Sequence, residues 1–130
     1  MMQTEYDILM IATGNDIRLI ENLMTSVEQN NTSLNVTMII VNQGNESISK
    51  SDNLFKIEII EHGNQISLSA ARNIALKYFF ESSLKAKHIM FPDDDTTFDS
   101  LFFKNFQKLV ESGKPYLGRV IGLEDGKDYK

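Results

Sequence analysis

Short apolar runs alternate along this chain with segments in which apolar residues recur at helical spacing. Such runs are typical of strands buried inside a sheet, and they lie at 6–12, 36–41, 55–60, 88–91 and 116–122. Helical spacing begins at Asp16, again near Leu68, and after Thr97, which we expect to cap the third helix. Strands that alternate with helices favour an α/β fold, and we predict a mainly parallel sheet in three layers, flanked by helices.

Each expected helix has one apolar face, which should pack on the sheet. In the first helix this face comprises Ile17, Ile20, Leu23, Met24 and Val27. In the second it comprises Leu68, Ala71, Ile74 or Ala75, and Tyr78, and in the third Phe102, Phe106, Leu109 and Val110. The run at 55–60 alternates in part between apolar and polar residues, which predicts a strand near an edge of the sheet.

The length of the chain, 130 residues, is enough for one substantial core, so we expect a single domain over 1–130 with 122–130 as an exposed tail. The formal net charge of −5 and the scattered lysines and arginines argue against a nucleic-acid partner. No stretch of the sequence is long and apolar enough for a transmembrane segment, and the first residues lack a basic leader. Because the chain also lacks cysteine, we expect a cytoplasmic protein.

Three polar clusters follow expected strands and should meet at one edge of the sheet. Residues 13–16 follow the first strand, 42–45 the second and 93–95 the fourth. Ligands of parallel α/β sheets bind outside the carboxyl ends of the strands, near a switch in strand order. Asn15 or Asp16 is expected to cap the first helix. The glycines match neither GxGxxG nor GxxxxGK(S/T), so a Rossmann dinucleotide site and a P-loop are excluded.

The three consecutive aspartates at 93–95 admit two interpretations. A hard cation such as Mg²⁺ or Mn²⁺ takes oxygen ligands, often one or two carboxylates completed by water and phosphate oxygens. Aspartates two apart in an extended chain point to the same side, so Asp93 and Asp95 would face one ligand while Asp94 pointed elsewhere. The alternative is a solvated entry to the third helix, where negative charge is favoured by about 0.3–1 kcal/mol.

A basic residue lies in the first turns of the second helix. Arg72, in the stretch SLSAARN, carries a planar charged group suited to phosphate or to the edge of a base. An ordinary surface arginine on an amphipathic helix would give the same pattern. His62 and His88 form no metal-binding motif, and we expect His88 to be structural.

The order of these features resembles the nucleotide-binding half of family 2 glycosyltransferases, which are inverting enzymes with the GT-A fold. IIVNQGN at 39–45 occupies the place of the family's V-D-x-S/G-x turn, LSAARN at 68–73 its A-R-N helix, and FPDDD at 91–95 its DxD element. The resemblance covers roughly residues 6–121. It implies a truncated GT-A domain, the nucleotide-sugar-binding part of a glycosyltransferase.

The resemblance also implies roles for single residues in donor binding. These are Ala12, Thr13 and Asn15 in the base pocket, Asn42 where the family has a base-binding aspartate, Arg72 on the nucleotide, and Asp93 and Asp94 at the ribose or sugar. Asp95, together with Asp93, would bind Mn²⁺ or Mg²⁺ that bridges the diphosphate. Such an ion neutralises the charge that develops on the leaving diphosphate.

The function implied by the resemblance is metal-dependent binding of a nucleotide-diphosphate sugar, a UDP-sugar, for inverting transfer. The acceptor would be a glycan or a lipid-linked glycan in polysaccharide biosynthesis. In the family the catalytic base lies well beyond the aspartates, and Asp125 and Asp128 come too early to be assigned as the base. We therefore leave the catalytic residues unassigned, and whether this chain alone performs transfer stays open.

Two alternative functions remain at this point. One is a non-catalytic nucleotide-sugar-binding or assembly module of the same fold, completed by a partner chain or by self-association into a homo-oligomer. The other is a Mg²⁺-dependent phosphotransferase or receiver-like domain. That class expects further acidic residues after the first strand and a lysine after the fifth, whereas this chain has only Asp16 and the sequence IGLED there.

Overall fold

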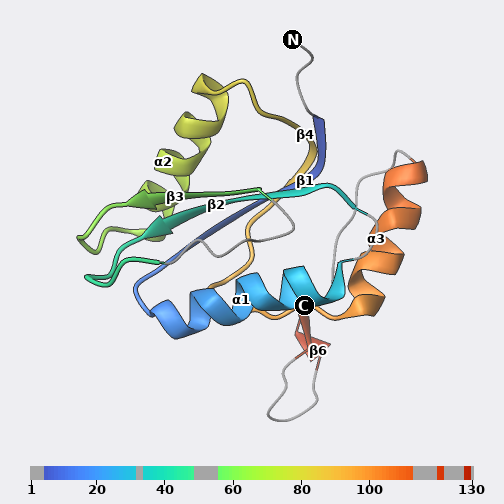
Figure 1. The fold of residues 1–130 in the computed structure, drawn as a ribbon, viewed down its shortest axis with the longest axis horizontal. Helices are drawn as coiled ribbons and strands as arrows, with labels where there is room; N and C mark the ends of the chain where they lie inside the picture. The colour runs from blue at the N-terminus through green and yellow to red at the C-terminus, as the bar shows by residue number, and fades with distance from the viewer. Residues whose placement is uncertain (1–4, 32–33, 49–55, 113–119, 122–127, 130) are drawn as a thin grey trace.

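The computed structural model describes residues 5–31, 34–48, 56–112, 120–121 and 128–129. Strands and helices alternate along it much as the apolar pattern predicts (Figure 1). The elements are β1 (Glu5–Gly14), α1 (Ile17–Asn30), β2 (Val36–Asn42), β3 (Lys56–Glu61), α2 (Leu68–Glu81), β4 (Lys85–Met90), α3 (Ser100–Ser112), β5 (Val120–Ile121) and β6 (Asp128–Tyr129).

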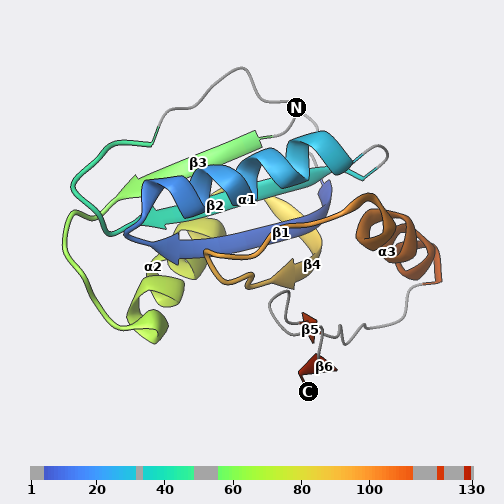
Figure 2. The same cartoon turned by 90° about the horizontal axis from the view of Figure 1, so that it is seen from below.

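The main sheet has four strands in the order β3-β2-β1-β4, and every neighbouring pair is parallel. In its register Ile8 of β1 lies opposite Val36 of β2 on one side and His88 of β4 on the other. Strands β1 and β2 lie at the centre of the sheet (Figure 2) and are its most deeply buried strands, while β3 lies at an edge, as its partial alternation predicts. The chain passes from one side of β1 to the other between β3 and β4, which makes the end of β1 a switch point.

Helices cover both faces of the sheet, which confirms the predicted three-layer α/β architecture. Figure 1 places α2 on one face and α1 with α3 on the other. Successive residues of a strand point to opposite faces. Accordingly Ile8 and Met10 of β1 belong to the core shared with α1 and α3, whereas Leu9 and Ile11 belong to the core shared with α2.

Helix α1 begins and packs as the sequence predicts. The side chain of Asp16 accepts a hydrogen bond from the backbone N–H of Arg18 (3.0 Å) and so caps the helix. The residues expected on its apolar face do face the core: Ile20, Leu23, Met24 and Val27 are buried, and Ile17 packs against the same cluster.

Helix α2 packs on the sheet through part of the face that its sequence predicts, because Ala71 and Ala75 of that face are buried. Its buried side chains are Ala71, Ala75 and Phe79, four residues apart. Leu68 and Tyr78, which the helical spacing placed on the buried face, are 50% and 38% exposed. The two alanines allow the helix to lie close to the sheet, and the buried stripe follows the four-residue spacing of Ala71, Ala75 and Phe79, which leaves Leu68 and Tyr78 at its borders.

Helix α3 begins later than the sequence suggested. Asp99, not Thr97, caps it, because the carboxylate of Asp99 accepts a hydrogen bond from the backbone N–H of Phe102 (2.8 Å). Phe103 and Phe106 are buried, and Phe102 is partly buried against them. The side chains of Leu109 and Val110 lie outside the described residues.

The fourth and fifth strands differ from their predicted bounds. Strand β4 begins at Lys85, three residues before the expected start at His88, because its first half pairs with β1 although it alternates with lysines. Of the fifth strand expected at 116–122, Val120–Ile121 lies in the described part and pairs antiparallel with Asp128–Tyr129. Among the helices of the described part, none reaches the length and hydropathy of a membrane span.

Candidate functional site

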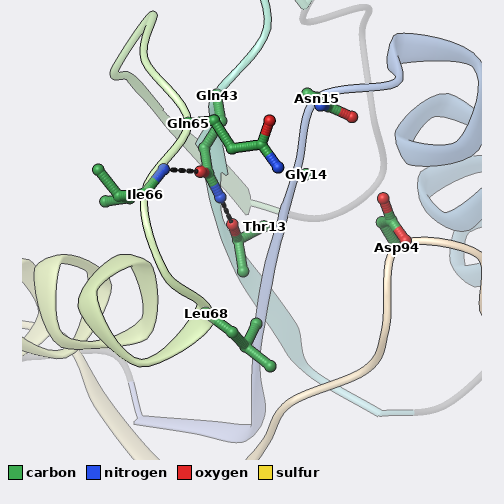
Figure 3. A pocket seen from close by; sticks show the side chains of 8 residues that line it. All are labelled: Thr13, Gly14, Asn15, Gln43, Gln65, Ile66, Leu68 and Asp94. Atoms are coloured by element: carbon green, nitrogen blue, oxygen red, sulfur yellow. Dashed lines mark hydrogen bonds between the residues drawn. The ribbon is translucent and has the colours of Figure 1, made fainter.

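A shallow cleft opens at the carboxyl edge of the main sheet (Figure 3), with a cavity volume of about 240 Å³. The ends of β1 and β2, the loop before α2 and the acidic turn after β4 converge there. Its lining residues are Thr13, Gly14, Asn15, Gln43, Gln65, Ile66, Leu68 and Asp94. This convergence confirms that the three polar clusters of the sequence meet at one edge of the sheet, beside the switch point at β1.

Gln43 connects three of the segments that form the cleft. Its backbone N–H donates to the carbonyl of Gly14 (2.8 Å), which extends the contact between β1 and β2 by one residue. Its side-chain amide donates to the hydroxyl of Thr13, and its side-chain oxygen accepts from the backbone N–H of Ile66 (2.7 Å) (Figure 3). Because both ends of the amide are bonded, the relative position of these three segments is fixed.

Asn42 precedes the lining residue Gln43 but does not itself line the cleft. It is 2% exposed, and its side-chain amide donates to the carbonyl of Glu46 (2.6 Å) and to the carboxylate of Glu61 (2.8 Å). Its side-chain oxygen accepts from the backbone N–H of Gly44 (3.0 Å). In this structure Asn42 therefore shapes the turn after β2 and joins it to the end of β3.

Two glycines allow the strand ends to approach one another. A Cβ atom on Gly14 would lie 2.5 Å from Oδ2 of Asp94 and 3.0 Å from its Cβ. A Cβ atom on Gly44 would lie 2.7 Å from the backbone oxygen of Asn15. Both distances are too short for a side chain, so a residue without Cβ is required wherever these segments meet at this spacing.

Of the three aspartates, Asp94 is the one in the cleft. It is half-buried, whereas Asp93 and Asp95 are exposed. An extended chain would place Asp93 and Asp95 on one side, but the backbone N–H of Thr96 donates to the carbonyl of Asp93 (3.0 Å) and closes a turn. In that turn the middle aspartate points inward, so the expectation that Asp94 points elsewhere is wrong.

The environment of Asp94 disfavours its charged form. Partial burial raises the pKa of the Asp94 carboxyl, and the neighbouring carboxylates of Asp95 and Asp93 raise that pKa further. Hydrogen bonds from the backbone of Asp94 and Asp95 oppose this shift without cancelling it. Two of the three causes that raise this pKa are neighbouring negative charges, so a cation placed beside Asp94 would lower it again.

The far end of the acidic segment is fixed to α1. Ser26 accepts a hydrogen bond from the backbone N–H of Phe98 (2.9 Å), and Asn30 donates to the carbonyl of Phe98 (2.9 Å). The ring of Phe98 is buried in the core beside α3. Together with Pro92, which is buried at the near end, these contacts fix both ends of the segment that carries the aspartates.

Arg72 faces the acidic segment from α2 but does not line the cleft. Its guanidinium carbon lies 5.0 Å from the ring centroid of Phe91, the residue that follows β4. The Nε atom of Arg72 is buried, and no acceptor within the described part of the chain is bonded to it. A buried donor without a partner is rare in proteins and therefore marks a functional candidate.

The structure thus gathers only some of the residues that the sequence singled out. Thr13, Asn15 and Asp94 line the cleft, and Ala12 is buried in the core on the α1 side. Asn42, Arg72, Asp93 and Asp95 are not among the lining residues. The sequence argument did not assign Gln65, Ile66 and Leu68. The loop HGNQIS follows β3 at the same edge, so the rule that ligands bind at the carboxyl ends of parallel strands also points to Gln65 and Ile66, which lie in this loop.

The residues present fit a hard divalent cation that is bound together with a phosphate. Among the described residues, no group of three or more histidine or acidic side chains is arranged to hold a metal ion alone. An ion that takes part of its shell from phosphate and water needs only one or two carboxylates. The half-buried Asp94, with Asp93 and Asp95 in the same turn, supplies that donor type.

The two histidines have structural contacts. Nδ1 of His62 lies 2.9 Å from the carbonyl oxygen of Asn64, and the ring of His88 packs edge-on against Phe106 (centroids 5.3 Å apart). His88 thus contacts α3 from β4, which agrees with the structural role expected of it.

Comparison with known proteins assigns the chain to a family. The sequence profile described as Glycosyl transferase family 2 matches residues 8–129, which is nearly the whole chain. Searches among curated proteins and among solved structures find no match for this sequence. The matched region contains β1 from Ile8 onward, the other strands of the main sheet and every residue of the cleft. The chain therefore belongs to glycosyl transferase family 2, whose members transfer glycosyl groups.

Proposed function

We propose that this protein binds a nucleotide-diphosphate sugar, a UDP-sugar, in the cleft at the carboxyl edge of the sheet, for inverting transfer to a glycan or lipid-linked glycan. The observation that carries the proposal is the position of the cleft in a chain of this family. The cleft opens at the switch point of a parallel sheet, with an acidic turn on one side of it. Parallel α/β sheets bind nucleotides at such points.

The cleft itself suits the nucleoside end of the donor. Its cavity of about 240 Å³ is smaller than the roughly 300–1,000 Å³ typical of pockets that enclose a whole ligand. Ile66 and Leu68 offer apolar surface to a base, while Asn15 and Gln65 offer amides that can both donate and accept hydrogen bonds. The diphosphate and sugar would then extend past Asp94 toward solvent.

The acidic turn is the place where we propose the metal-dependent step of binding. Asp95 and Asp93 would hold Mn²⁺ or Mg²⁺ with the diphosphate, and Asp94 would hold the ion or the sugar side of the donor. Such an ion supplies Lewis-acid stabilisation of the negative charge on the diphosphate. The chain's own contribution is to fix the turn from both ends, through buried Pro92 and through the bonds from Ser26 and Asn30 to Phe98.

The proposal assigns no catalytic base. An inverting transfer needs a group that removes the proton of the acceptor hydroxyl within hydrogen-bond reach. We assign none of the described residues to that role, so a donor-binding module completed by a partner chain remains the alternative with the same site. The two differ in turnover and not in donor binding.

The test is calorimetric titration of UDP and UDP-sugars, with Mn²⁺ and with a chelator. We expect binding that requires the metal, weakens in Asp95→Ala and Asp94→Asn, and is unchanged in Glu111→Gln, which removes an exposed acidic charge from α3. Folded wild-type protein that binds no nucleotide under either condition would refute the proposal. Binding of equal strength with the chelator would refute its metal-dependent part.

A further inference from the structure

Arg72 lies with its guanidinium over an aromatic ring. Its guanidinium carbon lies 5.0 Å from the ring centroid of Phe91. A guanidinium at this distance over a ring is attracted to the negative face of the π system. No acceptor in the described part of the chain bonds its buried Nε, and the ring is the contact of the guanidinium that carries the inference.

Phe91 joins this arginine to the acidic turn. It lies between the last residue of β4, Met90, and the buried Pro92, and the aspartates begin at the next residue. Phe91 is 38% exposed although it is a large apolar side chain, so burial in the core does not explain its position. Its ring instead covers the guanidinium of Arg72, which α2 brings to this face of the sheet.

We propose that Phe91 is a positioning residue, whose ring holds Arg72 apart from the aspartates and ready for an anionic oxygen of the donor nucleotide. This inference rests on the proposed function, since it concerns the same donor. Its physical basis is competition: three carboxylates follow Phe91 within four residues, and a guanidinium pairs readily with a carboxylate. An arginine that paired with them would neutralise the positive and the negative parts of the site together.

The first readout uses the free protein and needs no nucleotide. The ring current of Phe91 should shift the NMR signals of the Arg72 side chain, and burial should slow solvent exchange of its Nε–H. We expect Phe91→Leu to abolish the shift and speed the exchange, whereas Phe91→Tyr keeps both. The matched control is Phe80→Leu, which removes an exposed ring of α2 that packs on Phe79. Unchanged Arg72 signals in Phe91→Leu would overturn the inference.

The second readout is the affinity for UDP with Mn²⁺. We expect Phe91→Leu to weaken binding by about two- to fivefold, the range for a partly exposed cation–π contact, and Phe91→Tyr to restore it. In an Arg72→Ala background, Phe91→Leu should add nothing, because the ring acts only through the arginine. If the ring were purely structural, Phe91→Leu would lower the melting temperature in the wild-type and the Arg72→Ala backgrounds and would change UDP affinity equally in both. That result would contradict the inference.

The two proposals fail in different ways. Wild-type protein that binds UDP, with Phe91→Leu binding equally well, would overturn the role of Phe91 and leave the proposed function intact. Wild-type protein that binds no UDP would refute the proposed function and, with it, the anionic ligand assigned to Arg72. The NMR comparison would still decide whether the ring holds the guanidinium.

Discussion

Substitution of Gly14 by alanine tests whether the cleft depends on the close approach of β1 to the acidic turn. The new Cβ would lie 2.5 Å from Oδ2, 3.0 Å from Cβ and 3.1 Å from Cγ of Asp94. Rotation of the side chain can remove the oxygen but not Cβ of Asp94, so the turn itself has to move by a few tenths of an ångström. Gly14 does not have a positive φ, so the clash and not backbone strain determines the effect.

The expected cost follows from that overlap. Inserting a methyl group into a packed contact destabilises proteins by about 1–3 kcal/mol. For a chain of this size each kcal/mol lowers the melting temperature by roughly 4 °C. We expect the lower half of the range, because the turn that has to move carries the exposed residues Asp93 and Asp95 and not core side chains.

The effect on donor binding should exceed the effect on stability. Displacement of the turn should cost the charged contact that Asp94 makes with the bound ion or donor. A hydrogen bond to a charged group contributes about 1.5–3 kcal/mol, so its loss corresponds to a roughly tenfold or greater loss of affinity for UDP with Mn²⁺. The assay is calorimetric titration beside thermal unfolding of the same samples. The geometry described for Asp94 would be refuted if Gly14→Ala kept full affinity and its melting temperature lay within about 1–2 °C of that of wild type, which is less than the roughly 4 °C expected for 1 kcal/mol.

Three further predictions concern residues around the cleft. Asp94→Asn should raise the melting temperature at pH 7, because the fold disfavours the charged form of Asp94 and the amide is neutral. The raised pKa means that the fold has the full stability of protonated Asp94 below the unfolded value of 3.8 and loses it as the pH rises through the folded pKa, so the gain from the substitution should vanish below pH 3.8. Gly44→Ala should destabilise by about 1–3 kcal/mol in chemical unfolding, since its Cβ would lie 2.7 Å from the backbone oxygen of Asn15, which cannot rotate away; a loss below about 0.5 kcal/mol would contradict this contact. Asn42→Asp should destabilise at pH 7 by about 1.5–3 kcal/mol, because a carboxylate would face that of Glu61 in place of a 2.8 Å hydrogen bond, and acidification toward pH 4 should recover part of the loss.

The sequence predicts the architecture of this protein better than the orientation of individual side chains. The strands β1 and β2 are buried on both faces, and such strands appear in a sequence as nearly continuous apolar runs, which is the pattern that predicted them. The position of the three polar clusters follows from the same parallel sheet. Helical spacing predicted the burial of Ala71 and Ala75, but it does not say how wide the buried stripe is, so the exposure of Leu68 and Tyr78 at its borders could not be predicted.

The site was predicted at the level of segments and not of residues. Asp94 points into the cleft because a turn begins at Asp93, and a pleated-strand argument cannot anticipate that turn. Likewise, the family's pattern suggested Asn42 for the base, while the structure places its amide in bonds to Glu46 and Glu61. Both differences arise from backbone hydrogen bonds in loops, where periodicity carries no information.

The most direct measurement is a map of backbone amide NMR shifts while UDP is titrated into the protein with Mg²⁺. The account predicts shifts concentrated at the ends of β1 and β2, in the loop at Gln65 and Ile66, and in the turn at Asp94. Those shifts should shrink in Asp94→Asn and when the metal is chelated. Saturable shifts concentrated elsewhere in the protein, or no shifts in folded protein, would contradict the assignment of the cleft as the donor site.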